Sequence, residues 1–132
     1  MSNVFVNPNP AIVATGPART LLPSESGSIV VFTKAAALTI TLPAPTTAGL
    51  RYDFVQNGAG AAQTVTIDAG AGLLLGNWNF TNAGGTTAGT PARNLNFLTA
   101  ASALGDYATF VSNGTHWICR AFTGITGGLS FT

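Results

Sequence analysis

Hydrophobic and polar side chains alternate along most of the chain, which is the pattern of β-strands. Residues 38–42 read L-T-I-T-L, and residues 50–56 repeat the alternation as L-R-Y-D-F-V-Q. Successive side chains of a strand point to opposite faces, so this period of two predicts strands with one apolar face. The turn-formers P-A-P-T-T-A-G separate the two segments and predict a β-hairpin. Its inward face should hold Leu38, Ile40, Leu42, Leu50, Tyr52 and Phe54.

Further strands follow from the same alternation. Residues 63–68 and 93–99 should form strands, and residues 73–75 a short one; Val65, Ile67, Leu95 and Phe97 should point inward. Residues 28–33, S-I-V-V-F-T, are nearly continuous in apolar side chains, which predicts a strand buried on both faces. No window combines helical apolar spacing with good helix formers, because Gly, Thr, Ala and Pro recur too often. We therefore expect an all-β fold.

The end of the chain contains a second predicted hairpin. Residues 106–112 and 115–122 are rich in β-formers, and Asn113-Gly114 lies between them. Asn-Gly favours a type I′ turn because both residues tolerate positive φ. The Gly-rich tail ends in Leu129 and Phe131, which a solvated tail would not need, so we expect it to contact a neighbouring chain.

Prolines divide the chain into an arm and a domain. Residues 1–23 hold four of the seven prolines, which favour extended backbone and cannot donate to a ladder. We predict an extended arm over residues 1–23, with one short strand near residues 11–15, followed by a β-sandwich domain over residues 24–132. Residues 77–91 are rich in Asn, Gly and Thr and predict a long protruding loop.

Charge is scarce in this sequence. Only 7% of its 132 residues are charged and the net charge is +1, with the five basic residues scattered, so there is no basic patch for nucleic acid. Ordinary domains carry about 25% charged residues. The low value indicates that part of the surface is covered by other chains. No stretch of the sequence resembles a membrane helix or an export signal, so no membrane partner is expected.

The candidate chemical groups do not combine into a site. His116 is the one histidine, and the acids Glu25, Asp53, Asp68 and Asp106 lie in four different segments, so neither a hydrolytic triad nor paired carboxylates are expected. One histidine and one cysteine cannot supply a metal-ligand set. Cys119 lies in an apolar strand and should be a buried hydrophobe. We expect no catalytic residue, no metal and no cofactor.

Four segments carry a resemblance to a known group of proteins. They are T-L-L-P-S-E-S-G-S-I-V-V-F (20–32), T-I-T-L-P-A-P-T-T-A-G-L-R-Y-D-F-V (39–55), T-V-T-I-D-A (64–69) and G-D-Y-A-T-F-V-S-N-G-T-H-W-I-C (105–119). Across residues 20–122 the chain resembles small β-sandwich proteins of tailed bacteriophage virions. The resemblance implies an antiparallel, jelly-roll-like sandwich that forms a homotrimer.

Within that group the chain is most similar to head decoration (cement) proteins. Such a protein would bind the major capsid protein on the outer capsid surface and bridge neighbouring subunits, after synthesis in the host cytoplasm. A chain that begins at methionine and ends soon after its last strand favours this free-standing form. The interface candidates are Val4, Phe5, Pro8, Pro10, Arg51, Asp53, Trp78, Phe80, Leu129 and Phe131; Arg51 and Asp53 could pair across protomers.

Two alternatives remain open. A tail-fibre or spike component would bind a host glycan through residues 77–91 and Trp78, since exposed aromatic rings can stack on sugars. A small enzyme would require an activity that is abolished in His116→Ala, and we expect that substitution to leave the function intact.

Overall fold

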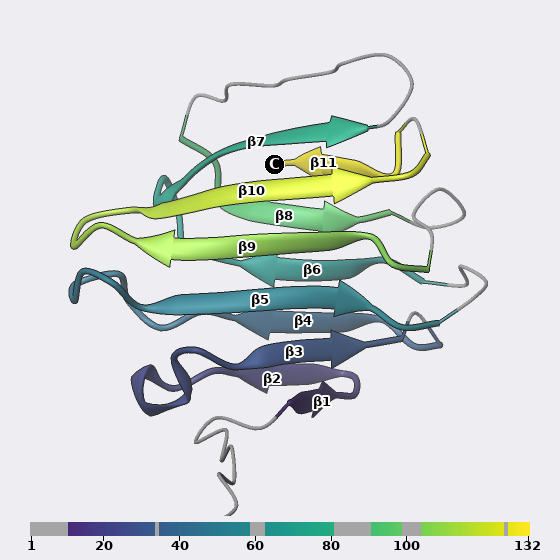
Figure 1. The fold of residues 1–132 in the computed structure, drawn as a ribbon, viewed down its shortest axis with the longest axis horizontal. Helices are drawn as coiled ribbons and strands as arrows, with labels where there is room; N and C mark the ends of the chain where they lie inside the picture. Colours follow the sequence, from purple (N-terminus) through teal and green to yellow (C-terminus); the bar gives the residue numbers. More distant parts are fainter. Residues whose placement is uncertain (1–10, 34, 59–62, 81–90, 99–103, 126) are drawn as a thin grey trace, which may run out of the picture.

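The regular structure of the described residues consists almost wholly of β-strands. The computed structural model describes residues 11–33, 35–58, 63–80, 91–98, 104–125 and 127–132, and gives the backbone alone for residues 77–80. Figure 1 shows β1 (Ile12–Ala14), β2 (Ala18–Thr20), β3 (Ile29–Phe32), β4 (Leu38–Thr41), β5 (Arg51–Gln56), β6 (Val65–Asp68), β7 (Leu74–Phe80), β8 (Asn94–Phe97), β9 (Tyr107–Ser112), β10 (Trp117–Thr123) and β11 (Leu129–Phe131). A 3-10 turn spans Pro23–Glu25. The prediction of an all-β fold is confirmed.

The strands form two mixed sheets. The six-stranded sheet has the order β1-β3-β5-β9-β10-β7, and the five-stranded sheet, which lies behind it in Figure 1, has the order β11-β8-β6-β4-β2. Among the described strands, five of the nine neighbouring pairs are parallel. A jelly roll is antiparallel throughout. The antiparallel prediction is therefore wrong, and the strand order does not support a jelly roll.

The parallel pairs arise because successive strands alternate between the sheets. From β1 to β6 every strand lies in the opposite sheet from its predecessor, and each such pair is an arch across the core. Stacking of these arches makes β1, β3 and β5 parallel in one sheet and β2, β4 and β6 parallel in the other. The hairpin predicted between residues 38 and 56 is such an arch, from β4 to β5. Its six predicted inward residues are all buried, but they face one another across the core.

Hydrogen bonds anchor both ends of the connection from β4 to β5. Pro43 follows the buried Leu42, and its carbonyl accepts a hydrogen bond from Trp117 Nε1 at 3.0 Å. Near the other end Ser112 Oγ donates to the Thr47 carbonyl and accepts from the Leu50 amide. Gly49 turns the chain with a φ of +89°, a conformation that favours glycine. These bonds join the arch to β9 and β10 of the six-stranded sheet.

The described part of the predicted arm belongs to the sheets. The short strand expected near residues 11–15 is confirmed as β1, and it pairs with β3. Residues 18–20 form a second strand, β2, which pairs with β4. An arm that stays outside the domain up to residue 23 is therefore not observed, because residues 12–20 complete both sheets at one end. Residues 1–10 of that arm lie outside the described residues.

Three further expectations are corrected by the strand pairing. The strand expected at 73–75 is longer, because β7 runs to Phe80 along β10. Residues 77–80 are therefore not part of a loop, and residues 81–90 lie outside the described part.

The strands β9 and β10 form the expected hairpin, but residues 113–116 connect them, so the turn is wider than a two-residue type I′ turn. The tail forms β11 beside β8 of its own chain, where expectation had placed it on a neighbour.

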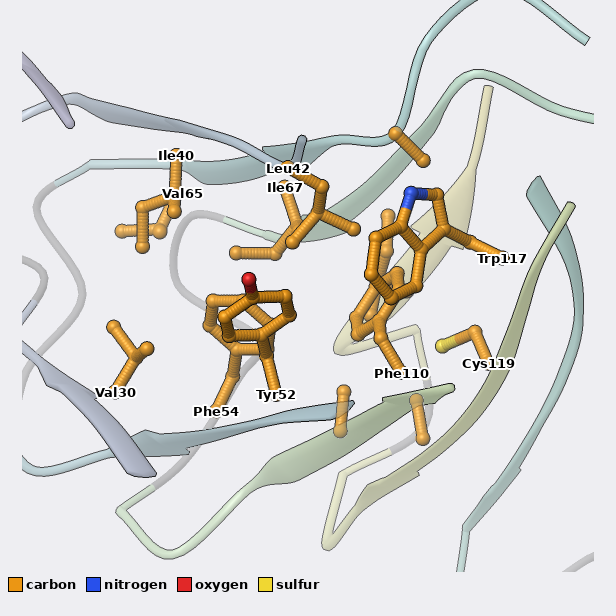
Figure 2. Packing of buried hydrophobic residues seen from close by; sticks show 14 of the residues in the cluster. Val30, Ile40, Leu42, Tyr52, Phe54, Val65, Ile67, Phe110, Trp117 and Cys119 are labelled. Carbon is orange, nitrogen blue, oxygen red and sulfur yellow. The ribbon is translucent and has the colours of Figure 1, made fainter. Parts of the chain in front are cut away.

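The core lies between the two sheets. In Figure 2 the labelled residues of the two sheets meet from opposite sides: Ile40, Val65 and Ile67 come from the five-stranded sheet, and Phe54, Phe110 and Trp117 from the six-stranded one. Phe54 and Phe110 meet edge to face with ring centroids 5.3 Å apart, and Phe32 reaches across to Phe97 at 4.9 Å. Edge-to-face pairs add to the stabilisation from burial. Val65, Ile67, Leu95 and Phe97 point inward as predicted.

Candidate functional site

The outer face of the six-stranded sheet is unusually apolar. One row runs in register across five strands, from Val13 through Val31, Val55 and Tyr107 to Phe122. Val13 is 74% exposed, and Tyr107 and Phe122 are stacked at 4.9 Å with 43% and 38% of their surfaces exposed. A second row holds Arg51, Val111, Ile118 and Leu75. We call this outer surface the apolar face; it is the face turned toward the viewer in Figure 1.

A polar row lies between these two rows. It runs from Asp53 through Thr109 to Arg120, and the apolar Ile29 of β3 precedes Asp53 in register. Asp53 Oδ1 accepts hydrogen bonds from Thr109 Oγ1 at 2.7 Å and from Arg51 Nη2 at 3.4 Å. The Arg120 side chain is exposed, and its guanidinium makes no hydrogen bond or ion pair with the described residues. Among the described residues, this face therefore carries the Asp53 carboxylate and, on the other side of Thr109, the Arg120 guanidinium without a side-chain partner.

The outer face of the five-stranded sheet has the opposite character. It presents small polar side chains in two rows: Thr39, Thr66, Asn96 and Ser130, and Thr20, Thr41, Asp68, Asn94 and Thr132. Many of them bond to one another: Thr66 Oγ1 donates to Asn96 Oδ1 at 2.9 Å, and Asn96 Nδ2 donates to Ser130 Oγ and to Thr132 Oγ1. This ladder of hydroxyl and amide groups is largely satisfied within the chain.

One ion pair lies at the end of this polar ladder. Arg93 Nη2 and Nε donate to the two carboxylate oxygens of Asp68 at 2.8 and 3.0 Å, and the Gly70 amide also donates to Asp68. The Arg93 hydrogen bond and the Gly70 amide lower the pKa of Asp68 below its ordinary value of 3.8, against the opposing effect of burial. The pair fixes the turn after β6 and is structural.

Two further titratable groups, Tyr52 and Cys119, are buried in the core. Burial, with a smaller effect from Glu25, raises the pKa of Tyr52 to about 12, and its hydroxyl donates to the Leu22 carbonyl at 2.6 Å. Burial also raises the pKa of the Cys119 thiol, which is 1% exposed, as expected for a core position. His116 Nδ1 lies 3.0 Å from Thr115 Oγ1 in the β9–β10 connection. Within the described ranges no three His, Cys, Asp or Glu side chains are placed to hold a metal ion, and no helix is long and apolar enough to cross a membrane.

The structure separates the predicted interface residues. Arg51 and Asp53 lie on the apolar face, as expected, but the contact between them is made within one chain. Leu129 is 3% exposed in the core of its own chain, and Phe131 packs against that core, which leaves Leu129 no surface for a partner. Trp78 and Phe80 lie in β7, where the backbone alone is described. Val4, Phe5, Pro8 and Pro10 fall outside the described residues.

Sequence reasoning missed most of the apolar face. Its exposed members include Val13, Ile29, Tyr107, Val111, Ile118 and Phe122. The signal was present in residues 28–33, where apolar side chains occupy both phases of the strand. That pattern predicted burial on both faces, whereas Ile29 is 45% exposed. Apolar residues in both phases of a strand therefore indicate that its second face is suited to contact with another molecule.

Comparisons with protein families, with curated proteins and with solved structures find no match for this chain.

Proposed function

We propose that the protein is a virion structural protein of the head decoration type, which binds the outer surface of a phage capsid and bridges neighbouring shell subunits. The observation that carries the proposal is the apolar face. Clusters of exposed apolar side chains rimmed by polar residues often mark interaction surfaces on soluble proteins. With only five basic and four acidic residues in the chain, the protein has little charge to keep that face dispersed in water. The choice of a phage capsid as the partner rests on the resemblance of residues 20–122 to virion proteins.

The mechanism is multivalent binding by an oligomer, for which the resemblance implies a trimer. A protein that binds the assembled shell and not its dissociated subunits stabilises the shell by mass action. Joining several copies raises the effective concentration of each contact after the first has formed. Salt screens contacts between exposed charges, but it has little effect on apolar contacts of this kind.

The proposal is tested by adding the purified protein to expanded empty capsids. We expect cosedimentation with the shells and a rise in the temperature at which they dissociate. The matched variants are Ile118→Asp, on the apolar face, and Thr39→Asp, on the polar face of the other sheet. Ile118→Asp should reduce the stabilisation and Thr39→Asp should retain it. Shells whose melting is unchanged at saturating protein would remove the proposal.

A second candidate function is binding of a host glycan, as in a tail fibre or spike. The observation that favours it is the outer face of the five-stranded sheet, whose hydroxyl and amide groups are suited to bonding with sugars. The hydrogen bonds already made among Thr66, Asn96 and Ser130 count against it, because a ligand would have to replace them. Saturable binding to host polysaccharide that is lost in Thr39→Asp would favour this function over capsid binding.

A further inference from the structure

We infer that the apolar face pairs with the same face of a second copy of the chain. The two copies are related by a two-fold axis that is parallel to β9 and lies between their facing six-stranded sheets. The inference concerns the purified protein, so it stands or fails without any capsid. Association without shell binding would refute the proposed function and leave this inference standing. Shell binding by a strict monomer would refute this inference and the oligomeric mechanism, but not the binding of the capsid itself.

The positions of two charges point to a second copy as the partner. Thr109 in β9 pairs with Asp53 of β5 on one side and with Arg120 of β10 on the other. The carboxylate and the guanidinium therefore lie one strand away from β9 in opposite directions. A two-fold axis along β9 exchanges the two directions. It places Arg120 of each copy opposite Asp53 of the other, so that the guanidinium, which has no side-chain partner among the described residues, meets a carboxylate at two symmetric positions.

The same axis brings apolar side chains together on both sides of these charges. Tyr107 and Val111 lie on β9 itself and meet their own counterparts. Val55 lies opposite Phe122, because β5 and β10 flank β9 in the row that contains Tyr107. Arg51 lies opposite Ile118, and an arginine can cover an apolar neighbour with its methylene stem while its charged end stays in water. Two such sheets pack with their strands nearly aligned, about 10 Å apart.

The size of the face sets the expected strength of this contact. Five overlapping strands at about 4.8 Å spacing and five residues at about 3.3 Å give roughly 400 Å² in projection on each copy. The total for the two copies is about 800 Å², below the roughly 1,200–2,000 Å² of stable specific interfaces, so the association should be weak and reversible. We expect a dissociation constant of roughly 1–100 μM, so the mass of the particle should rise with concentration.

A contact of this type uses one patch on both copies, which gives a dimer or an even-numbered assembly. It differs in this respect from the trimer that the virion resemblance implies. The stoichiometry of the purified protein therefore distinguishes the two.

The experiment is sedimentation analysis of the full chain over a range of concentrations, with two complementary variants. Arg120→Asp places like charges opposite one another in its own dimer, and so does Asp53→Arg. Each variant alone should weaken association at least about tenfold, since like charges facing each other across an interface are strongly unfavourable. In an equimolar mixture both contacts become attractive again, and the two variants should associate with each other to within a few-fold of the wild-type strength. Thr39→Asp, on the other sheet, is the matched control and should associate like the wild type.

Asp53→Arg also removes the acceptor of Thr109, so its folding must be verified by circular dichroism. Should it fail to fold, Val111→Asp provides a second variant, because the two-fold axis places the two introduced carboxylates together and association should again be lost. A wild-type protein that stays monomeric at high concentration would overturn the inference. So would a trimer that Arg120→Asp leaves intact, or variants that fold but do not associate when mixed.

Discussion

Tyr52 and Tyr107 lie in neighbouring strands of the same sheet but on opposite faces, and they differ in what their hydroxyl groups do. Tyr52 is fully buried and its hydroxyl donates to the Leu22 carbonyl, whereas Tyr107 is 43% exposed and its hydroxyl makes no hydrogen bond with the described residues. Tyr52→Phe should therefore lower the free energy of unfolding by about 1 kcal/mol. Tyr107→Phe, the matched control, should change it little. Urea denaturation measures both, and equal effects would contradict the assigned role of the Tyr52 hydroxyl.

Asp68 gives the stability of the fold a defined pH dependence. Its pKa is lower in the folded chain than the ordinary 3.8, because Arg93 and the Gly70 amide bond the ionised form. A depressed pKa contributes stability that is present above the unfolded value and is lost as the pH falls through the folded value. Asp68→Asn should therefore cost about 1 kcal/mol at pH 7, and the difference from the wild type should vanish in acid below the folded pKa. A difference that persists there would contradict this account.

Residue periodicity identified which side chains face the core. Leu38, Ile40, Tyr52, Val65 and Leu95 were placed inward by alternation alone, and all are buried. The same rule did not predict the surroundings of the side chains that point away from the core. Period two shows that two sets of side chains point in opposite directions, but it does not show what covers the outward set. The exposure of Ile29 and Tyr107 therefore required the structure.

At the scale of elements, β1 gives the sharpest test of where the domain begins. Ala14 is 4% exposed among core residues, while its neighbour Val13 points outward and is 74% exposed. Ala14→Asp should cost about 3 kcal/mol or more because it buries an unpaired charge. Val13→Asp, one residue away on the same strand, should lie within about 0.5 kcal/mol of the wild type. Thermal unfolding of the two variants compares them, and a harmless Ala14→Asp would place these residues outside the domain.

Most strands could be predicted from the sequence, but whether β4 and β5 pair with each other could not. β4 and β5 were both expected, because each alternates, and the connecting turn-formers suggested a hairpin. In a hairpin the two apolar sets lie on one face of one sheet, and in an arch they face each other across the core. Alternation is identical in the two cases. The hairpin of β9 and β10 was predicted correctly because its connection is short, whereas residues 43–50 are long enough to cross between sheets.

At the scale of the whole molecule, the two outer faces divide the protein into a polar side and an apolar side. The polar side satisfies itself through bonds such as that of Thr66 to Asn96, while the apolar side leaves Phe122 and Ile118 in contact with water. The scarcity of charge predicted that part of the surface would be covered. It could not predict which part, because that depends on which strands share a sheet and in what register.

The most direct test of the proposed function is to ask, by high-resolution imaging of phage particles assembled with this protein, whether and where the protein binds. We expect its two-sheet domain on the outer surface of the capsid, in contact with more than one shell subunit, with the apolar face covered by protein. Density for the domain in the tail, or a domain on the capsid whose apolar face is open to solvent, would contradict it.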